Sequence, residues 1–329
     1  ISFRNFYSAG IHTNHGLYAT LYSFPAMMKR NLMKGSVIPR YSGLPTVLKE
    51  NGYYNLFFMT HEGQYDNMNA FFRTNGYDEV FSQENYPADK VVNSFGVQDD
   101  FLYDYAIPVL NQRAATGEPF FATLLSISNH PPYVIPPFFH PKTSEPETQI
   151  VEYADWALRK FFEEARKQPW FDNTIFVLEG DHGKLVGDAE CELPESYNHI
   201  PLMIYSSRIH PEEKNTFGGQ VDIQPTILGL LNIDYLQNNF GVDLLKEERP
   251  CMFYTADNMV VGRNDTLLYL YNYETQQELT YDIGNGKLNA VPMDDSFLPL
   301  KEYSFSMLQS AEFLVKHGKT VNSVPVTQQ

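Results

Sequence analysis

Short apolar runs alternate with helix-like segments over the first two thirds of the chain. The apolar runs Tyr53–Met59, Pro119–Ile127 and Thr174–Leu178 have strand lengths and end at polar or turn-forming residues. Between them, Gly43–Asn51 and Glu147–Gln168 carry apolar residues at helical spacing, which in the second segment are Val151, Ala154, Leu158, Phe161 and Phe162. Continuous apolar strands are typical of parallel sheets covered on both faces. The alternation predicts an α/β fold with a doubly wound, mostly parallel sheet.

The pattern changes after Gly241. Val260–Leu270 and Glu278–Ile283 have strand-like composition, and Glu302–His317 has the pattern of a closing helix. We expect a small antiparallel subdomain that carries no obvious chemistry. The predicted domains are therefore a catalytic α/β domain at residues 1–245 and a small C-terminal α+β subdomain at residues 246–329.

Composition narrows the class of protein. The 329 residues are 43% hydrophobic, which is ample for a packed core, and the net charge is −16 without a cluster of Lys or Arg. Nucleic acid is excluded as a partner because phosphate backbones require a basic surface. No apolar run approaches the ~20 residues of a membrane span. The chain opens on the strand-like segment Ile1–Tyr7, and we interpret it as a processed or truncated piece. Cys191 and Cys251 could pair or stay reduced.

The polar residues after the strand-like runs are candidates for a site, because ligands of open α/β sheets bind beyond the carboxyl ends of the strands. Gly180-Asp181-His182-Gly183 follows one run, and Asp and His are ligands suited to Zn²⁺ or Mn²⁺. The alternative is that Asp181 caps a helix and His182 is incidental. His130 follows another run and precedes two prolines, so a fixed loop could aim its imidazole at a phosphoryl oxygen or a leaving group. The alternative for His130 is a surface turn.

Three further segments offer polar side chains. Thr13 lies among the turn-forming residues after the opening strand; its hydroxyl is a nucleophile when a metal or base activates it, and otherwise an N-cap. His199 begins a strand-like run and is a ligand contact or a hydrogen-bonded structural histidine. The loop at residues 61–69 offers substrate contacts or is a solvated loop.

Taken in order, seven segments resemble the lipoteichoic acid synthase family. They span about residues 1–245 and read GIHTNHG, YDNMNAFFRTNGYDEVF, SISNHPPY, VEYADWALRKFFE, TIFVLEGDHG, NHIPLMIY and VDIQPTILGLLNI. The resemblance implies a fold of the alkaline phosphatase and sulfatase type. It also implies a parent protein anchored in a bacterial membrane, with this domain facing outward into the periplasm or the cell surface.

The resemblance also implies roles for individual residues. Thr13 matches the nucleophile, which is phosphorylated or glycerophosphorylated during turnover and also contacts the metal. Asp181 and His182 match metal ligands, and the family's further ligand, a glutamate, would precede Ile1. The implied cofactor is one divalent ion, with Mn²⁺ expected ahead of Zn²⁺ or Mg²⁺. His130 matches the histidine that approaches the transferred phosphate, and His199 is similar to an active-site histidine of phosphoethanolamine transferases.

One departure from the family concerns the substrate. Synthases that polymerise glycerol phosphate carry a Trp and an Arg in the loop before GYD, whereas this chain has neither at residues 65–68. We expect Asp66 and Asn67 to contact a different head group. The expected function is an extracytoplasmic, metal-dependent phosphotransferase that moves a phosphoglycerol- or phosphoethanolamine-type head group from a lipid-linked or glycan phosphodiester.

Two other functions compete with this expectation. A phosphodiesterase or sulfatase-like hydrolase would use water as the acceptor, although neither cysteine lies in the C/S-x-P-x-R pattern of formylglycine sulfatases. A degenerate domain would bind a head group or glycan without turnover. Retention of Thr13, His130, Asp181 and His182 argues against such decay.

Overall fold

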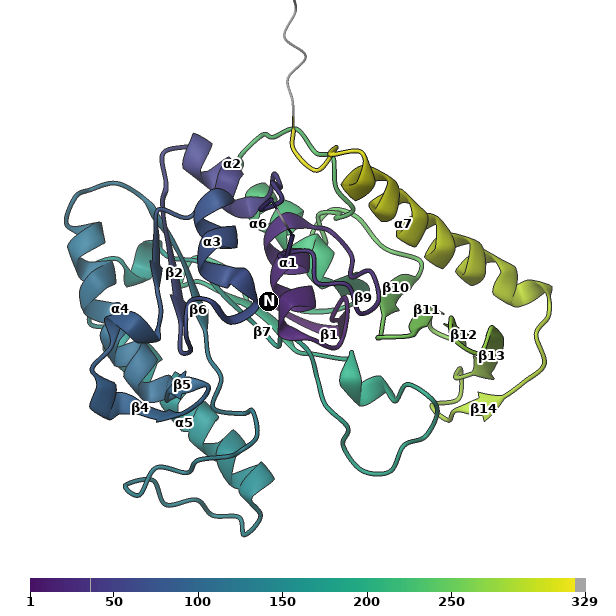
Figure 1. The fold of residues 1–329 in the computed structure, drawn as a ribbon, viewed down its shortest axis with the longest axis horizontal. Coiled ribbons are helices and arrows are strands. Elements are labelled where there is room, and N and C mark those ends of the chain that lie inside the picture. The colour runs from purple at the N-terminus through teal and green to yellow at the C-terminus, as the bar shows by residue number, and fades with distance from the viewer. Residues whose placement is uncertain (36, 323–329) are drawn as a thin grey trace, which may run out of the picture. The chain divides into compact units, whose positions relative to one another are not determined.

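The computed structural model describes residues 1–35 and 37–322, which divide into two compact units (Figure 1). The first unit contains Ile1–Gly35, Pro39–Leu44 and the chain from Ile175 onward, and the second contains Pro45–Thr174. The boundary expected at residue 245 separates the two sheets of the first unit, and it stays a prediction.

The central sheet of the first unit is mixed. Its strand order is β7 (Phe176–Glu179), β8 (Leu202–Tyr205), β1 (Ser2–Tyr7) and β9 (Glu213–Gly219). β1 is parallel to β9, but β8 is antiparallel to both β1 and β7. The expectation of a doubly wound, mostly parallel sheet is therefore wrong for this unit. β7 and β8 are joined by a segment without an α-helix, and parallel neighbours need a crossover connection, usually helical.

Helix α1 (Thr13–Tyr22) follows β1 directly and is buried along most of its length. Helix α6 (Ile223–Leu230) packs against α1 and follows β9 through the short 3₁₀ helix η6 (Gln220–Asp222). The loops after β1, β7 and β9 therefore all belong to this unit, and they carry the candidate metal and nucleophile residues.

The C-terminal antiparallel sheet is confirmed. It is a meander of five strands in chain order with helix α7 (Leu298–Lys316) packed on β10 and β11. The predicted strand Val260–Leu270 is two strands, because the chain turns at Asn264, whose side chain accepts hydrogen bonds from the next turn. The strands are β10 (Met252–Thr255), β11 (Met259–Arg263), β12 (Leu267–Asn272), β13 (Gln277–Asp282) and β14 (Asn289–Ala290).

The sheet of the second unit is parallel, as the apolar runs predict. Its order is β3 (Glu79–Phe81), β2 (Tyr54–Met59) and β6 (Phe120–Leu125). Stacked rings fill its core, with Phe57 and Phe72 at 4.1 Å between centroids. The helices of this unit are α2 (Leu44–Glu50), α3 (Met68–Thr74), α4 (Asp99–Ala114) and α5 (Pro146–Ala165).

Helix α5 is confirmed, but its buried face differs from the expected one. The expected stripe included Val151, which is 50% exposed. The buried face is formed by Ile150, Tyr153, Ala157, Phe161 and Ala165. Helix α5 carries more than one row of apolar residues, and the row that is buried is the one that packs against α4.

Short elements complete the described chain. A hairpin joins β4 (Val91–Asn93) to β5 (Gly96–Val97). The 3₁₀ helices are η1 (Tyr65–Asn67), η2 (Gln83–Asn85), η3 (Ala88–Lys90), η4 (Phe171–Asn173), η5 (Glu195–Tyr197), η6 (Gln220–Asp222) and η7 (Asp295–Phe297). Cys191 and Cys251 are free thiols. Over residues 1–35 and 37–322, no helix is both long and apolar enough to cross a membrane.

Candidate functional site

Thr13 is the first residue of helix α1 and is half-buried. The N-cap position belongs to His12, whose backbone is extended and whose side chain makes no capping hydrogen bond. The N-cap alternative for Thr13 is therefore not adopted. The first N–H groups of a helix have no intrahelical partner and attract anions, so this position suits a hydroxyl that meets a phosphoryl group.

Asp181 and His182 lie in the loop that follows β7. No helix begins at Asp181, so the helix-cap alternative is not adopted either. The Oδ1 atom of Asp181 accepts a hydrogen bond from the His182 backbone N–H at 2.9 Å. The Nδ1 atom of His182 donates to the Gly183 carbonyl at 2.7 Å, and its Nε2 atom lies 3.6 Å from Asp181 Oδ2.

This geometry fits a pair of metal ligands. A ring that donates through Nδ1 keeps its lone pair on Nε2, the arrangement usual for metal-bound histidine. Two ligand atoms with bonds of ~2.1 Å in tetrahedral geometry lie ~3.4 Å apart, close to the separation seen here. Within the part of the chain that the structure describes, no three His, Cys, Asp or Glu side chains form a complete metal-binding group.

Gly16 brings the first turn of α1 against the Asp181 loop. A Cβ atom on Gly16 would lie 2.5 Å from the Asp181 carbonyl oxygen, so only glycine allows this approach without a shift. Thr13 lies one helical turn before Gly16. The structure therefore brings the turn that carries Thr13 together with the loop that carries Asp181 and His182.

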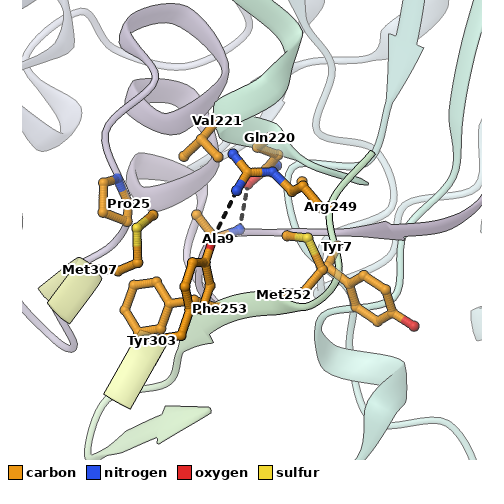
Figure 2. Close-up of a pocket in the computed structure, with 11 residues that line it drawn as sticks. Tyr7, Ala9, Pro25, Gln220, Val221, Arg249, Met252, Phe253, Tyr303 and Met307 are labelled. Atoms are coloured by element: carbon orange, nitrogen blue, oxygen red, sulfur yellow. Dashed lines mark hydrogen bonds between the residues drawn. The ribbon is translucent and has the colours of Figure 1, made fainter. Parts of the chain in front are cut away.

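Gln220 and Asn198 are fully buried polar residues that hold these loops. Gln220 accepts a hydrogen bond from the Ala9 backbone, as Figure 2 shows, and donates to the carbonyls of Gly180 and Asp181. Asn198 donates to Ser8 Oγ at 3.2 Å. No local pattern in the sequence marks a role for either residue, although Asn198 precedes the predicted His199 and Gln220 precedes the segment VDIQPTILGLLNI.

The C-terminal sheet contributes Asp257 to this region, and the expectation that this subdomain carries no obvious chemistry stays a prediction. Asp257 lies in the loop between β10 and β11, and its Oδ1 atom is 2.6 Å from His12 Nε2. The ring of His15 packs edge-on against His12 at 5.0 Å between centroids. Burial, followed by the charge of His12, lowers the pKa of His15 to about 4, so His15 is neutral at pH 7.

Glu179 is the last residue of β7 and lies two residues before Asp181. Burial raises the pKa of Glu179 to about 8. The Thr20 hydroxyl donates to its Oε1 atom at 2.5 Å. Glu179 therefore attaches the end of β7 to the middle of α1, away from the first turn of that helix.

His199 lies beside β1, and the structure does not join it to Thr13 or His182 by any described contact. Its Nε2 atom is 2.6 Å from the Arg4 carbonyl, and its ring stacks on Tyr7 at 5.1 Å between centroids. This environment fits the alternative of a hydrogen-bonded structural histidine. The expected contact with substrate stays a prediction.

His130 belongs to the second unit and lies in the loop after β6. Its Nδ1 atom donates to the Pro131 carbonyl at 2.7 Å, and its ring packs on Phe95 at 4.1 Å between centroids. Asp99, at the start of α4, accepts hydrogen bonds from the Ile127 and Ser128 backbones at 3.0 and 2.9 Å. The His130 loop is therefore attached to the end of a helix in its own unit.

Asp66 and Asn67 also lie in the second unit, in η1 after β2. Both have left-handed backbones, with φ of 50° and 64°, and both are half-buried. The neighbouring Tyr65 ring packs on His61 at 4.7 Å and faces Phe95 at 6.5 Å. The loops after β2 and β6 thus meet through aromatic rings, although no described contact joins Asp66 or Asn67 to His130.

The cavity drawn in Figure 2 is lined by Ala9 and Gln220 but not by Thr13, Asp181 or His182. It is lined mainly by apolar side chains, and Arg249 hydrogen-bonds to Tyr303 at 2.8 Å on one wall. Its volume of about 10 Å³ has room for about one water molecule. It is therefore too small to hold a substrate.

The fold, with a threonine-led helix beside an Asp–His loop, is that of the alkaline phosphatase class. A protein of the alkaline phosphatase superfamily from Vibrio parahaemolyticus superposes with a TM-score of 0.87 at 26% identity, covering 98% of this chain and 80% of that one. The lipoteichoic acid synthase LtaP from Listeria monocytogenes superposes with a TM-score of 0.82 at 21% identity, covering 96% and 83%.

The chain belongs to the sulfatase family, whose sequence profile matches residues 1–233. It is also 26% identical over 270 residues to lipoteichoic acid synthase 1 of Bacillus subtilis (strain 168), which covers 75% of this chain and 40% of that protein. Lipoteichoic acid synthase 2 of the same organism is 25% identical, covering 62% of this chain and 35% of that protein. The chain thus spans two fifths or less of the length of these two relatives.

Proposed function

We propose that this chain is the catalytic part of a metal-dependent phosphotransferase. It would move a phosphoglycerol- or phosphoethanolamine-type head group from a lipid-linked or glycan phosphodiester, through a covalent intermediate on Thr13. The observation that supports this most directly is the contact between the first turn of α1 and the Asp181 loop, since it brings the turn that carries Thr13 against the loop that carries the candidate ligands Asp181 and His182.

In the first step, the Thr13 oxygen attacks the phosphorus of the donor. A phosphorus–oxygen bond forms at Thr13, and the bond to the lipid or glycan alcohol breaks. The positive N-terminal end of the α1 dipole would favour the charged non-bridging oxygens. In the second step, an acceptor hydroxyl attacks the phospho-threonine ester and regenerates Thr13.

Asp181 and His182 would hold the divalent ion, Mn²⁺ ahead of Zn²⁺ or Mg²⁺, together with Thr13 and a ligand outside this sequence. The bound ion would supply positive charge that favours the alkoxide form of Thr13 and offsets the charge of the phosphoryl oxygens. Asp181 orients this pair by accepting the His182 backbone N–H.

The other assigned residues have roles that rest on the motif resemblance. His130 would protonate the leaving oxygen, His199 would contact substrate, and Asp66 and Asn67 would bind the head group. The parent protein would be anchored in a bacterial membrane with this part in the periplasm or at the cell surface. The similarity to lipoteichoic acid synthases supports a reaction that builds lipoteichoic acid or a related polymer.

The test uses the intact parent protein with Mn²⁺ and vesicles of either phosphatidylglycerol or phosphatidylethanolamine. Diacylglycerol release measures the first step, and mass spectrometry of the Thr13 peptide detects the covalent intermediate. We expect metal-dependent release with one lipid and a head-group adduct on Thr13. The Thr13→Ala variant should lose activity by more than about 10³-fold.

Each other outcome identifies a different function. Full activity in Thr13→Ala would show that Thr13 is not the nucleophile. Transfer of the head group to water alone, whatever alcohol is supplied, would identify a phosphodiesterase. Binding of vesicles without release or adduct would identify a binding domain.

A further inference from the structure

A single buried side chain joins the two loops that carry the proposed site. Gln220 is fully buried at the start of η6. Its Oε1 atom accepts a hydrogen bond from Ala9 N at 2.8 Å, in the loop between β1 and Thr13 (Figure 2). Its Nε2 atom donates to the carbonyls of Asp181 at 2.7 Å and Gly180 at 3.1 Å. Gln220 therefore binds the nucleophile loop and the metal-ligand loop at the same time.

The three partners determine the orientation of this amide. A primary amide has two N–H donors on nitrogen and an acceptor oxygen. A flipped amide would place its oxygen against two carbonyls and its NH₂ group against the Ala9 N–H, losing all three bonds. Both N–H groups of the Gln220 amide are used, one toward each carbonyl.

The carbonyl of Asp181 also lies close to helix α1. Gly16 lies so close that a Cβ atom there would be 2.5 Å from this carbonyl and 2.9 Å from Gln220 Nε2. The first turn of α1, the Asp181 carbonyl and the Gln220 amide therefore pack at one point.

We propose that Gln220 is a positioning residue, which sets the distance between the Thr13 hydroxyl and the Asp181–His182 pair. Gln220 does not touch the reacting atoms; it acts through the Ala9 backbone and through the two carbonyls. This inference rests on the proposed function for its catalytic consequence. The coupling of the two loops is a property of the fold and can be measured separately.

The matched control is Gln224, one turn further along the chain in α6. It is also buried, with 1% exposure, and its side chain is hydrogen-bonded to Ser23 and Asn239 at 3.1 Å each. None of these residues belongs to the loops at Ala9 or Asp181. Gln220→Leu and Gln224→Leu therefore remove similar buried amides, but only the first separates the two loops.

The experiment measures three quantities in the intact protein and in both variants: amide hydrogen exchange, Mn²⁺ affinity by titration, and head-group transfer. We expect Gln220→Leu to accelerate exchange at Ala9 and at residues 181–183, and to weaken Mn²⁺ binding about 10–100-fold, as loss of supporting contacts around metal ligands does. The turnover number should fall more than the apparent lipid affinity. Gln224→Leu should change none of these by more than its effect on melting temperature explains.

A third variant separates the two arms of the amide. Gln220→Glu keeps an acceptor for Ala9 N but places carboxylate oxygens against the Asp181 and Gly180 carbonyls. We expect exchange at Ala9 to stay slow while exchange at residues 181–183 increases. Equal acceleration of exchange at Ala9 and at residues 181–183 would contradict this division of the amide into two arms.

The results distinguish this inference from the proposed function. Wild-type protein without Mn²⁺ binding or head-group transfer contradicts the proposed function, and the exchange data alone then decide the coupling. If wild-type protein is active and Gln220→Leu keeps its turnover and Mn²⁺ affinity, Gln220 is structural only and the positioning role is wrong. Equal losses in both leucine variants would also overturn it.

Discussion

His182 Nε2 and Asp181 Oδ2 lie 3.6 Å apart, in a loop where the Nδ1 atom of the same histidine is hydrogen-bonded to a backbone carbonyl. This arrangement predicts that both side chains bind one divalent ion. Asp181→Asn and His182→Gln should each weaken Mn²⁺ affinity by more than the ~10–100-fold typical of lost supporting contacts. Titration of the purified protein, followed by electron paramagnetic resonance of unbound Mn²⁺, measures this affinity.

Asp188→Asn is the control for that measurement. Asp188 is exposed in the same loop, and its substitution changes the net charge by the same amount. Its Mn²⁺ affinity should equal that of the wild type. If Asp181→Asn and Asp188→Asn behaved alike, the metal assignment would have to be abandoned.

Asp99 should control the stability of the loop that carries His130. Its Oδ1 atom accepts two backbone N–H groups, from Ile127 and Ser128. Asp99→Ala leaves these donors without their acceptor and should lower the free energy of unfolding by about 2–3 kcal/mol. Asp99→Asn keeps an Oδ1 acceptor and should cost much less. Urea denaturation measures both, and equal losses would contradict this account.

The same residue predicts a pH dependence. Burial raises the pKa of Asp99, so the folded state holds this proton more tightly than the unfolded state. The free energy of unfolding should therefore fall as pH rises from the unfolded pKa of ~3.9 through the raised folded pKa. Asp99→Asn should flatten the profile over that interval. A variant profile parallel to that of the wild type would show that Asp99 does not contribute.

Asp222 and Arg249 form the buried ion pair of the first unit. Their side chains are 0% and 9% exposed, and Asp222 also accepts the Gly219 and Val242 backbone N–H groups. Arg249→Met leaves a buried carboxylate without its cation and should cost about 3–5 kcal/mol in urea denaturation. The control is Arg4→Met, which breaks an ion pair whose side chains are 65% and 50% exposed and should change stability little. Equal losses of stability in Arg249→Met and Arg4→Met would show that burial does not determine what the ion pair contributes.

In the second unit, substitutions at Gly96 and Gly117 measure two costs of an added side chain separately: backbone strain at positive φ and steric overlap. Both have positive φ, 92° and 80°, but a Cβ atom on Gly96 would overlap the Thr60 carbonyl, whereas one on Gly117 would meet nothing within 4 Å. Gly117→Ala should cost only the left-handed strain of about 1–2 kcal/mol. Gly96→Ala should cost more and should also disturb the neighbouring Phe95 and His130 rings. Thermal unfolding and the NMR resonances of the His130 imidazole test this. Similar losses of stability in the two variants would show that steric overlap at Gly96 adds no cost.

Much of the fold could be predicted from local patterns. The apolar runs at Tyr53–Met59 and Pro119–Ile127 became β2 and β6, because a continuous apolar run of strand length favours a strand covered by other elements. β2 is buried over five of its six residues, whereas β6 is mostly half-buried. The direction of β8 could not be predicted. It depends on the connection from β7, and the sequence there contains the site loop, with no pattern that excludes a helical crossover.

The candidate site also has one part that the sequence predicts and another that it does not. Asp181 and His182 are adjacent in sequence, so their proximity required no tertiary information, and the resemblance of the segment GIHTNHG to the family motif identified Thr13 as the candidate nucleophile. The partnership of His12 with Asp257 crosses 245 positions of the chain. Only the placement of the β10–β11 loop creates it, and neither residue carries a local signal for the other.

The sequence by itself determined the strand and helix types, the family and the residues suited to metal and phosphoryl chemistry, because these follow from side-chain composition and near-neighbour spacing. Only the tertiary structure decided which of these residues lie close together. It placed the turn that carries Thr13 against the Asp181 loop and hydrogen-bonded His199 to the Arg4 carbonyl. It also made the Gln220 side chain the link between the two loops. Such choices depend on the packing of distant segments, where one buried donor must meet one acceptor, and no local pattern in the sequence encodes that pairing.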